Sequence, residues 1–225
     1  MFHDVKENPS RWNTTPRRFR EIVEIISIHP NRDKITITVD DAGKGNFQFI
    51  LPILREFDFQ TYIFVPTKFI SNENSKSSYM TESQIRTLSE EGHIIGSHSH
   101  THPINISLLD QNEILEEWKK SKNILENITG KEILSCSIPG GFFTRKQIDI
   151  LGQLGYDEIF NSVPTFKMKN IGTMNVNGRF SIERNTSNGQ LNSILNMDYI
   201  NQKKLELRQF VSQKFHTVKH SFMKS

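Results

Sequence analysis

Cysteine is almost absent from this 225-residue sequence, which contains only Cys136. A single thiol excludes an intrachain disulfide and a zinc site built from cysteines. No apolar run approaches the length of a membrane span. The polar, charged first 20 residues contain no apolar signal-peptide region. We therefore expect a cytoplasmic protein that forms one domain over residues 1–225, which is long enough to bury a sizeable core.

The net charge is only +3, and it is unevenly distributed along the chain. Residues 1–20 carry +3, residues 203–225 carry +5, and the body between them carries −5. An acidic body does not favour nucleic-acid binding. Apolar residues at helical spacing predict that 203–225 is a basic helix or tail. Such a helix lies on an anionic membrane or, as we favour, packs on the protein's own core.

Hydrophobic patterning predicts strands that alternate with helices. Residues 1–16 are expected to be irregular, and 17–28 fit either a strand or a short helix. Predicted strands cover 35–39, 61–65, 93–96, 133–138 and 158–163, with one or two more between 174 and 184. Predicted helices cover 45–57 and the stretches that begin at Thr81, Asp110 and Thr144, each with Gln or Glu three residues later as a capping box. The chain from about residue 190 is expected to be helical.

Strands and helices that alternate at least four times predict parallel strands with right-handed crossovers, as an open sheet or a barrel. In both folds, sites form at the carboxyl ends of the strands. Three stretches, TVDDA at 38–42, HSHTH at 98–102 and SIPGG at 137–141, reach just past the ends of predicted strands. The residues that lie just after the strands are Asp40-Asp41, His98 to His102 and Pro139-Gly140-Gly141. One face of a barrel would bring all three together.

Histidine and aspartate in two of these stretches suggest a metal site. His98 and His102 are four residues apart, so a helical turn or a tight loop would bring both rings to one face. An extended segment would instead align His98, His100 and His102. Neutral imidazole is a common metal ligand. The adjacent carboxylates of Asp40 and Asp41 end a β-branched run and add oxygen ligands.

The same three stretches, in this order, resemble the polysaccharide deacetylase family, the NodB-type carbohydrate esterases of family 4. That family carries T-F-D-D-G after its first strand, H-[S/T]-x-x-H after a later strand, and an R-x-P-x-G loop. The resemblance covers about residues 35–165. It implies an α/β fold, a distorted (β/α) barrel of the NodB type.

The resemblance also implies one divalent metal ion, held by Asp41, His98 and His102, with Asp40 as the catalytic base. Zinc is the expected metal, and iron, cobalt and nickel are compatible with the same ligands. Three protein ligands leave positions for a water and a substrate carbonyl, and the metal lowers the pKa of that water. His100 is expected to support the loop rather than to bind the metal.

The loop after the fourth predicted strand is expected to form part of the substrate wall. Its residues are Pro139, Gly140, Gly141 and Phe142. An aromatic side chain there could equally well pack into the core. The family's motif with a tryptophan has no clear match, because the only tryptophans are Trp12 and Trp118.

The chain departs from the family pattern at three points. Ala42 replaces a glycine, which is a mild change. Ser137 stands where the family has an arginine that pairs with the base, so the pKa and orientation of Asp40 must be set in another way, for which Arg145, Arg179 and Arg184 are the candidates. The family's last motif supplies a histidine that protonates the leaving amine. Here the only histidines after residue 103 are His216 and His220.

These residues favour a metal-dependent hydrolase that removes an N-acetyl group, or secondarily an O-acetyl group, from a sugar or glycan precursor. The alternative is a catalytically impaired family member that binds a carbohydrate or a protein partner. A third reading is an amidase or deformylase-like enzyme of the same fold that acts on a non-sugar amide.

Overall fold

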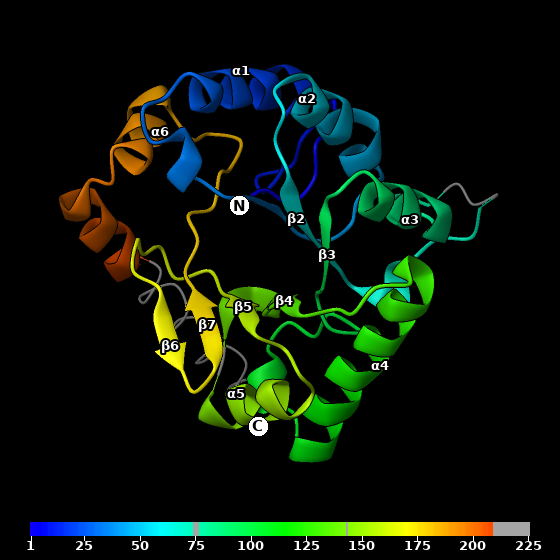
Figure 1. The fold of residues 1–225 in the computed structure, drawn as a ribbon. Helices are drawn as coiled ribbons and strands as arrows, with labels where there is room; N and C mark the ends of the chain where they lie inside the picture. Colours follow the sequence, from blue (N-terminus) through cyan, green and yellow to red (C-terminus); the bar gives the residue numbers. More distant parts are fainter. Residues whose placement is uncertain (74–76, 143, 209–225) are drawn as a thin grey trace, which may run out of the picture.

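The computed structural model describes residues 1–73, 77–142 and 144–208. Helices lie outside a curled sheet, as Figure 1 shows. The elements in chain order are α1 (Pro16–Ser27), η1 (Arg32–Lys34), β1 (Ile37–Val39), η2 (Asn46–Ile50), α2 (Leu51–Glu56), β2 (Thr61–Val65), η3 (Thr67–Phe69), α3 (Glu82–Glu90), β3 (Ile94–Ser97), η4 (Ile106–Leu108), α4 (Gln111–Thr129), β4 (Ser135–Ser137), η5 (Pro139–Gly141), α5 (Arg145–Gln153), β5 (Glu158–Phe160), β6 (Lys169–Ile171), β7 (Met174–Asn177) and α6 (Asn188–Leu195). Residues 199–208 are also helical.

The strands form one seven-stranded sheet in the order β1-β2-β3-β4-β5-β7-β6. Every neighbouring pair is parallel except β6 and β7. The sheet curls into a half-barrel, which confirms the predicted α/β class and the distorted barrel. Because the strands from β1 to β5 are parallel, their carboxyl ends meet at one edge of the sheet.

The first residues of the chain lie between β1 and the segment that follows β7. The Phe2 N–H donates to the Thr38 carbonyl (2.8 Å), and the Asp40 N–H donates to the Phe2 carbonyl (2.9 Å). On the other side, the Ile182 N–H donates to the Met1 carbonyl (2.9 Å). This N-terminal segment therefore extends the sheet beyond β1, although its sequence predicts only irregular structure.

The helices begin where side chains can satisfy their free N–H groups. All three predicted capping boxes are present, at Thr81, Asp110 and Thr144. The ambiguous stretch 17–28 is the helix α1, because Thr15 accepts a hydrogen bond from the Arg18 N–H and Pro16 occupies the first turn. Gly130 ends α4 in the left-handed conformation, with a φ of 67°.

The sequence-based predictions for residues 165–184 were partly wrong. The strand β6 was not predicted, because its three residues are exposed or only half-buried and carry no apolar alternation. Only β7 forms within 174–184. A Cβ on Gly178 would lie 2.3 Å from the Val163 carbonyl oxygen. The chain passes too close to that carbonyl for any other residue, and it then leaves the sheet.

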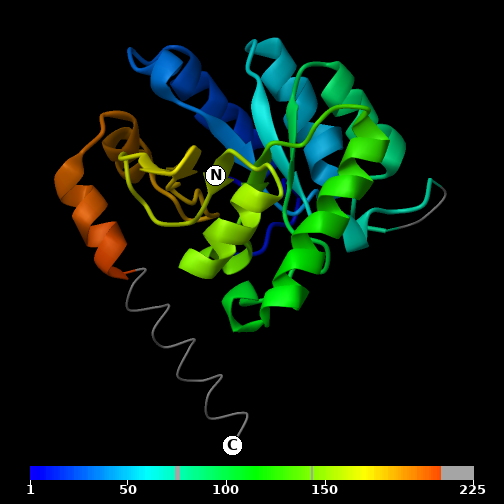
Figure 2. The same ribbon diagram turned by 60° about the horizontal axis from the view of Figure 1, so that its bottom comes forward.

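Buried side chains form two clusters. One cluster joins α3, α4 and α5 to the sheet and includes Trp118 and Tyr156. The other joins α1, α2 and α6 to Phe2 and β1. Figure 2 shows α4 on one flank of the molecule and the C-terminal helical residues on the opposite flank. Of the predicted basic segment, 203–208 is helical, and 209–225 lies outside the described residues.

Among the described residues, we find no helix with the length and apolarity needed to traverse a bilayer.

Candidate active site

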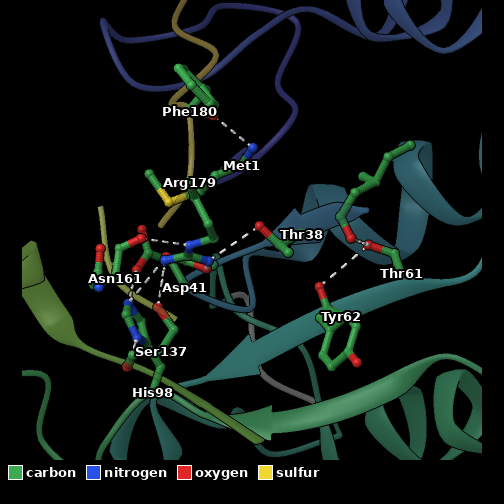
Figure 3. A network of polar contacts seen from close by, with 12 residues as sticks. Met1, Thr38, Asp41, Thr61, Tyr62, His98, Ser137, Asn161, Arg179 and Phe180 are labelled. Carbon is green, nitrogen blue, oxygen red and sulfur yellow. Dashed lines mark hydrogen bonds and ion pairs between the residues drawn. The ribbon is translucent and has the colours of Figure 1, made fainter. Parts of the chain in front are cut away.

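Three parallel strands deliver the predicted site residues to one edge of the sheet. Asp40 and Asp41 follow β1, His98 follows β3, and Ser137 ends β4. Figure 3 shows Asp41, His98 and Ser137 grouped around the guanidinium of Arg179. The structure thus brings together residues that are up to about 140 positions apart in the chain.

Asp41, His98 and His102 form a compact cluster in which one ligand atom from each residue lies within 4.8 Å of the others. The two histidine Nε2 atoms are 3.2 Å apart. Asp41 Oδ1 lies 3.6 Å from His98 Nε2 and 3.5 Å from His102 Nε2. Ligands at 2.0–2.2 Å from a tetrahedral zinc ion are about 3.3–3.6 Å apart, so the donor set fits such an ion.

The tautomer of His98 also fits metal binding. The His98 Nδ1–H donates to the Ser137 carbonyl at 2.7 Å, which leaves the Nε2 lone pair free for a cation. Burial lowers the pKa of His98 to about 3 and also lowers the pKa of His102. Both imidazoles are therefore neutral near pH 7, as metal ligands must be.

The two ligand loops contain residues with left-handed backbone conformations. The φ angles are 70° at Asp41, 52° at Ala42, 61° at Ser99 and 54° at His102. Non-glycine residues rarely adopt this region, and each costs on the order of 1 kcal/mol. Ser99 Oγ accepts the His102 N–H at 3.1 Å, which helps to hold the second loop. Such strain is concentrated at functional sites. The conformation of these loops is therefore consistent with a role in positioning the candidate metal ligands.

Arg179 pairs with Asp40 through two hydrogen bonds. Its Nη1 donates to Asp40 Oδ1 at 2.7 Å and its Nη2 to Asp40 Oδ2 at 2.9 Å. Arg179 also donates to the Asn161 carbonyl (3.1 Å) and to Thr38 Oγ1 (3.2 Å). The side chain is 5% exposed. All these partners are buried, so the guanidinium is fixed in one orientation.

Ser137 completes this network at the position where the resembled family has an arginine. Its Oγ accepts from Arg179 Nη2 at 2.7 Å and donates to Asp40 Oδ2 at 3.1 Å. Of the three arginines considered from the sequence, only Arg179 reaches the base. Arg145 pairs with Asp149 on the surface, and Arg184 donates to the Pro9 carbonyl. The small serine leaves room for an arginine that enters from another part of the chain.

The two adjacent carboxyls differ in their electrostatics. Burial opposes ionisation of Asp40, but the charge and hydrogen bonds of Arg179, together with the effects of His98 and His3, outweigh it and hold the pKa of Asp40 well below its usual range. Burial raises the pKa of Asp41 to about 6, and the neighbouring Asp40 charge adds to the rise. Asp40 is therefore an anion at every ordinary pH, whereas the positive charges of His3 and Arg179 only partly offset the effect of burial on Asp41. A metal ion bound by Asp41 would favour its ionised form.

The predicted substrate loop follows β4 at the same edge of the sheet. Pro139, Gly140 and Gly141 form η5, and Phe142 after them is half-buried. The φ angles of Gly140 and Gly141 are 66° and 73°, and a Cβ on Gly140 would lie 2.7 Å from the Ile104 carbonyl oxygen. The loop therefore requires both glycines, and its contact with substrate stays a prediction.

Four further histidines divide into three cases. His100 hydrogen-bonds Thr67 Oγ1 at 2.9 Å and is not part of the metal cluster, in line with its expected supporting role. His216 and His220 lie outside the described residues. His3, which the sequence analysis missed, influences the pKa of both Asp40 and Asp41. No local signal marks His3, because it precedes the first predicted element.

Comparisons with known proteins agree with this geometry. A family model described as "Polysaccharide deacetylase" matches residues 27–159. Peptidoglycan-N-acetylmuramic acid deacetylase PdaA of Bacillus subtilis is 29% identical over 131 residues, which are 57% of this chain and 46% of PdaA. The chain spans less than half the length of the curated relatives it matches.

Solved structures show the same fold. IcaB from Ammonifex degensii superposes with a TM-score of 0.73 at 16% identity, over 87% of this chain and 93% of that one. The deacetylase PplD of Streptococcus pyogenes, solved in complex with acetate, superposes with a TM-score of 0.69 at 17% identity, over 87% and 96% of the two chains.

Proposed function

This chain belongs to the polysaccharide deacetylase family, and from that membership we propose that it is a metal-dependent hydrolase acting on an acetylated glycan. The bond cleaved would be the amide of an N-acetyl group or, secondarily, the ester of an O-acetyl group. The substrate would be a sugar or a polysaccharide precursor. Zinc is the metal we propose, since two imidazoles and one carboxylate suit it.

The observation that best supports catalysis is the ion pair between Arg179 and Asp40. Without a cation beside it, a buried Asp40 would tend to take up a proton and could not act as a base. Arg179 provides that cation, although position 137, where the family has an arginine, is a serine in this chain. The base is therefore ionised and oriented next to the candidate metal ligands.

The chemistry follows from these residues. A divalent ion held by Asp41, His98 and His102 would polarise the acetyl carbonyl and make water at the site more acidic. Asp40 lies 3.8 Å from His98 Nε2, at the edge of that ligand set. It would accept the proton that water loses as the water oxygen bonds to the acyl carbon. Arg179 and Ser137 would keep the carboxylate directed at that water.

A catalytically impaired family member that binds a carbohydrate or a protein partner is the second candidate. The sequence favours this candidate, because it has no histidine between residues 103 and 215 that could protonate the leaving amine. Acetate release decides between the two candidates.

The experiment is a deacetylation screen on N-acetylated sugar oligomers with the protein loaded in turn with zinc, cobalt, nickel or iron(II). We expect acetate release by the wild type and a loss of at least about 100-fold in Asp40→Asn. Asp149→Asn, which removes an exposed carboxylate, is the matched control and keeps full activity. Bound metal and bound oligomer without acetate release under every metal would favour the second candidate.

A further inference from the structure

The helical residues 199–208 expose only apolar and basic side chains. The exposed residues are Tyr199, Ile200, Lys203, Lys204, Leu207 and Arg208. They form two rows in which successive residues are four positions apart, so they share one side of the helix. Gln202, which is buried, and the half-buried Glu206 fall on the other side. The helix therefore presents a face to solvent that is both apolar and basic.

The residues that lead into β6 extend this face. They are Lys167, Met168 and Lys169, and all three are exposed. The Phe166 N–H donates to Gln202 Oε1 at 3.2 Å, and the ring centroids of Phe166 and Tyr199 are 5.4 Å apart. Figures 1 and 2 show the two segments side by side, on the flank away from α4. We call residues 167–169 together with the exposed face of 199–208 the basic-apolar surface.

Positive charge dominates the basic-apolar surface. The segments 165–171 and 198–208 contain five lysines and arginines but only two carboxylates, those of Asp198 and Glu206. Asp198 accepts two backbone N–H groups at the start of the helix, and Glu206 pairs with Lys203 at 2.9 Å. Both carboxylates are thus engaged within the helix, and the charge that faces solvent is mostly basic.

The apolar side chains of this surface are strongly exposed. Ile200 is 73% exposed, Leu207 is 65% exposed and Met168 is 56% exposed. Leu207 belongs to the segment that the sequence predicts to pack on the core, yet it faces solvent. Apolar groups in water are stabilised by transfer to an apolar medium. The surface therefore suits a partner that is anionic and apolar at once.

We propose that the basic-apolar surface binds the surface of an anionic lipid bilayer. Lysine and arginine are attracted to the acidic headgroups, and apolar side chains between them enter the boundary with the acyl chains. The sequence that follows, 209–225, contains three lysines and no acidic residue, so it continues the positive charge. The helix would lie along the bilayer rather than cross it. The proposal does not depend on the proposed hydrolase function.

Three other occupants match the surface less well. Lysine is depleted at protein–protein interfaces, whereas this surface has four lysines. A second copy of the chain would bring like charges together, which opposes association. A nucleic acid would match the charge, but it would leave Ile200 and Leu207 without an apolar partner.

The test is co-sedimentation of the full chain with lipid vesicles. The vesicles consist of phosphatidylcholine alone or of phosphatidylcholine with about 30% phosphatidylglycerol. We expect binding to the anionic vesicles to be about 100-fold tighter or more, because each basic residue near the bilayer strengthens binding about fivefold. Salt at about 0.5 M should remove most of that difference by screening.

Two double variants separate the apolar from the basic contribution. Ile200→Ser with Leu207→Ser should weaken binding to the anionic vesicles about tenfold or more, because apolar burial is lost. Lys169→Gln with Lys204→Gln should also weaken it about tenfold or more, because two headgroup contacts are lost. All four side chains are exposed, so we expect the thermal unfolding midpoint to stay unchanged.

Matched controls carry the same changes elsewhere on the molecule. Lys119→Gln with Lys120→Gln alters exposed residues of α4, and Ile28→Ser alters a side chain that is 86% exposed after α1. Both controls should bind the anionic vesicles within about twofold of the wild type, because charges beyond the screening length contribute little.

Several outcomes would overturn the proposal. Equal binding to both kinds of vesicle, or binding to neither, would refute it. Equal weakening by the two lysine variants would assign the attraction to net charge alone. Full binding by both surface variants would place the contact elsewhere in the chain. Dimerisation in sedimentation velocity without lipid, lost in the Ile200→Ser and Leu207→Ser variant, would make the surface an interface between copies. None of these measurements requires acetate release, so failure of the proposed function leaves them interpretable.

Discussion

Arg179 and Asp40 form a buried ion pair with two hydrogen bonds although they are 139 positions apart in the chain. Asp40 directly follows β1, and Arg179 lies just after β7, the last parallel strand of the sheet. The pair therefore spans the open side of the half-barrel next to the N-terminal segment. The ion pair joins the candidate base to the segment after β7, whose structure was predicted least accurately from the sequence.

Removal of this cation should destabilise the protein. We expect Arg179→Met to lower the free energy of unfolding by about 3–5 kcal/mol, because Asp40 then stays buried without a partner. Arg145→Met breaks an exposed pair and should cost less than about 1 kcal/mol. Urea unfolding of both variants at pH 8, without metal, measures the difference. Equal and small losses would mean that the ion pair does not hold the open side together.

An arginine at position 137 should be able to replace Arg179 as the partner of Asp40. Ser137 Oγ already lies 3.1 Å from Asp40, so an arginine at 137 can reach the carboxylate once Arg179 vacates its space. We expect Ser137→Arg to restore at least about 1 kcal/mol of the stability lost in Arg179→Ser, by re-pairing the buried carboxylate. Ser137→Met in the same background fills a similar volume without charge. It should restore nothing, and restoration by both substitutions would point to packing instead.

Metal binding should depend on three side chains only. We expect about one divalent ion per chain in the wild type after reloading, and its loss in Asp41→Ala and in His98→Ala. His100→Ala is the control, because that ring bonds Thr67 and is outside the cluster. Mass spectrometry of the dialysed proteins measures the stoichiometry. Retention of metal by Asp41→Ala would place the ion elsewhere.

The apparent metal affinity should fall in mild acid. Burial raises the pKa of Asp41 to about 6, so below that pH the ligand is protonated and the ion must displace a proton. Above pH 6 the affinity should be nearly independent of this group, and below it the affinity should fall about tenfold per pH unit. His98, with its pKa lowered to about 3, adds no competition in this range. Calorimetric titration from pH 5 to 8 measures the midpoint, and a flat profile would contradict this account.

Much of the fold could be predicted from local patterns. Capping boxes at Thr81, Asp110 and Thr144 locate three helix starts, because a cap is satisfied within four residues of chain. Apolar runs locate the buried strands, because this signal also lies within a few consecutive residues. The exposed strand β6 carried no such pattern and was missed. The metal cluster was predicted because its ligands lie in two short motifs that directly follow buried strands.

The sequence by itself determined the helices, the buried strands and the polar residues at their carboxyl ends, because each depends on neighbours within a few positions. Only the tertiary structure decided which arginine neutralises Asp40 and which segment lies beside β1. Three arginines were equally compatible with the sequence, and His3 belonged to a stretch without any pattern. Contacts such as Arg179 with Asp40, or Phe2 with Val39, depend on the path of the whole chain. Their partners are selected by the geometry of the curled sheet, which no local pattern encodes.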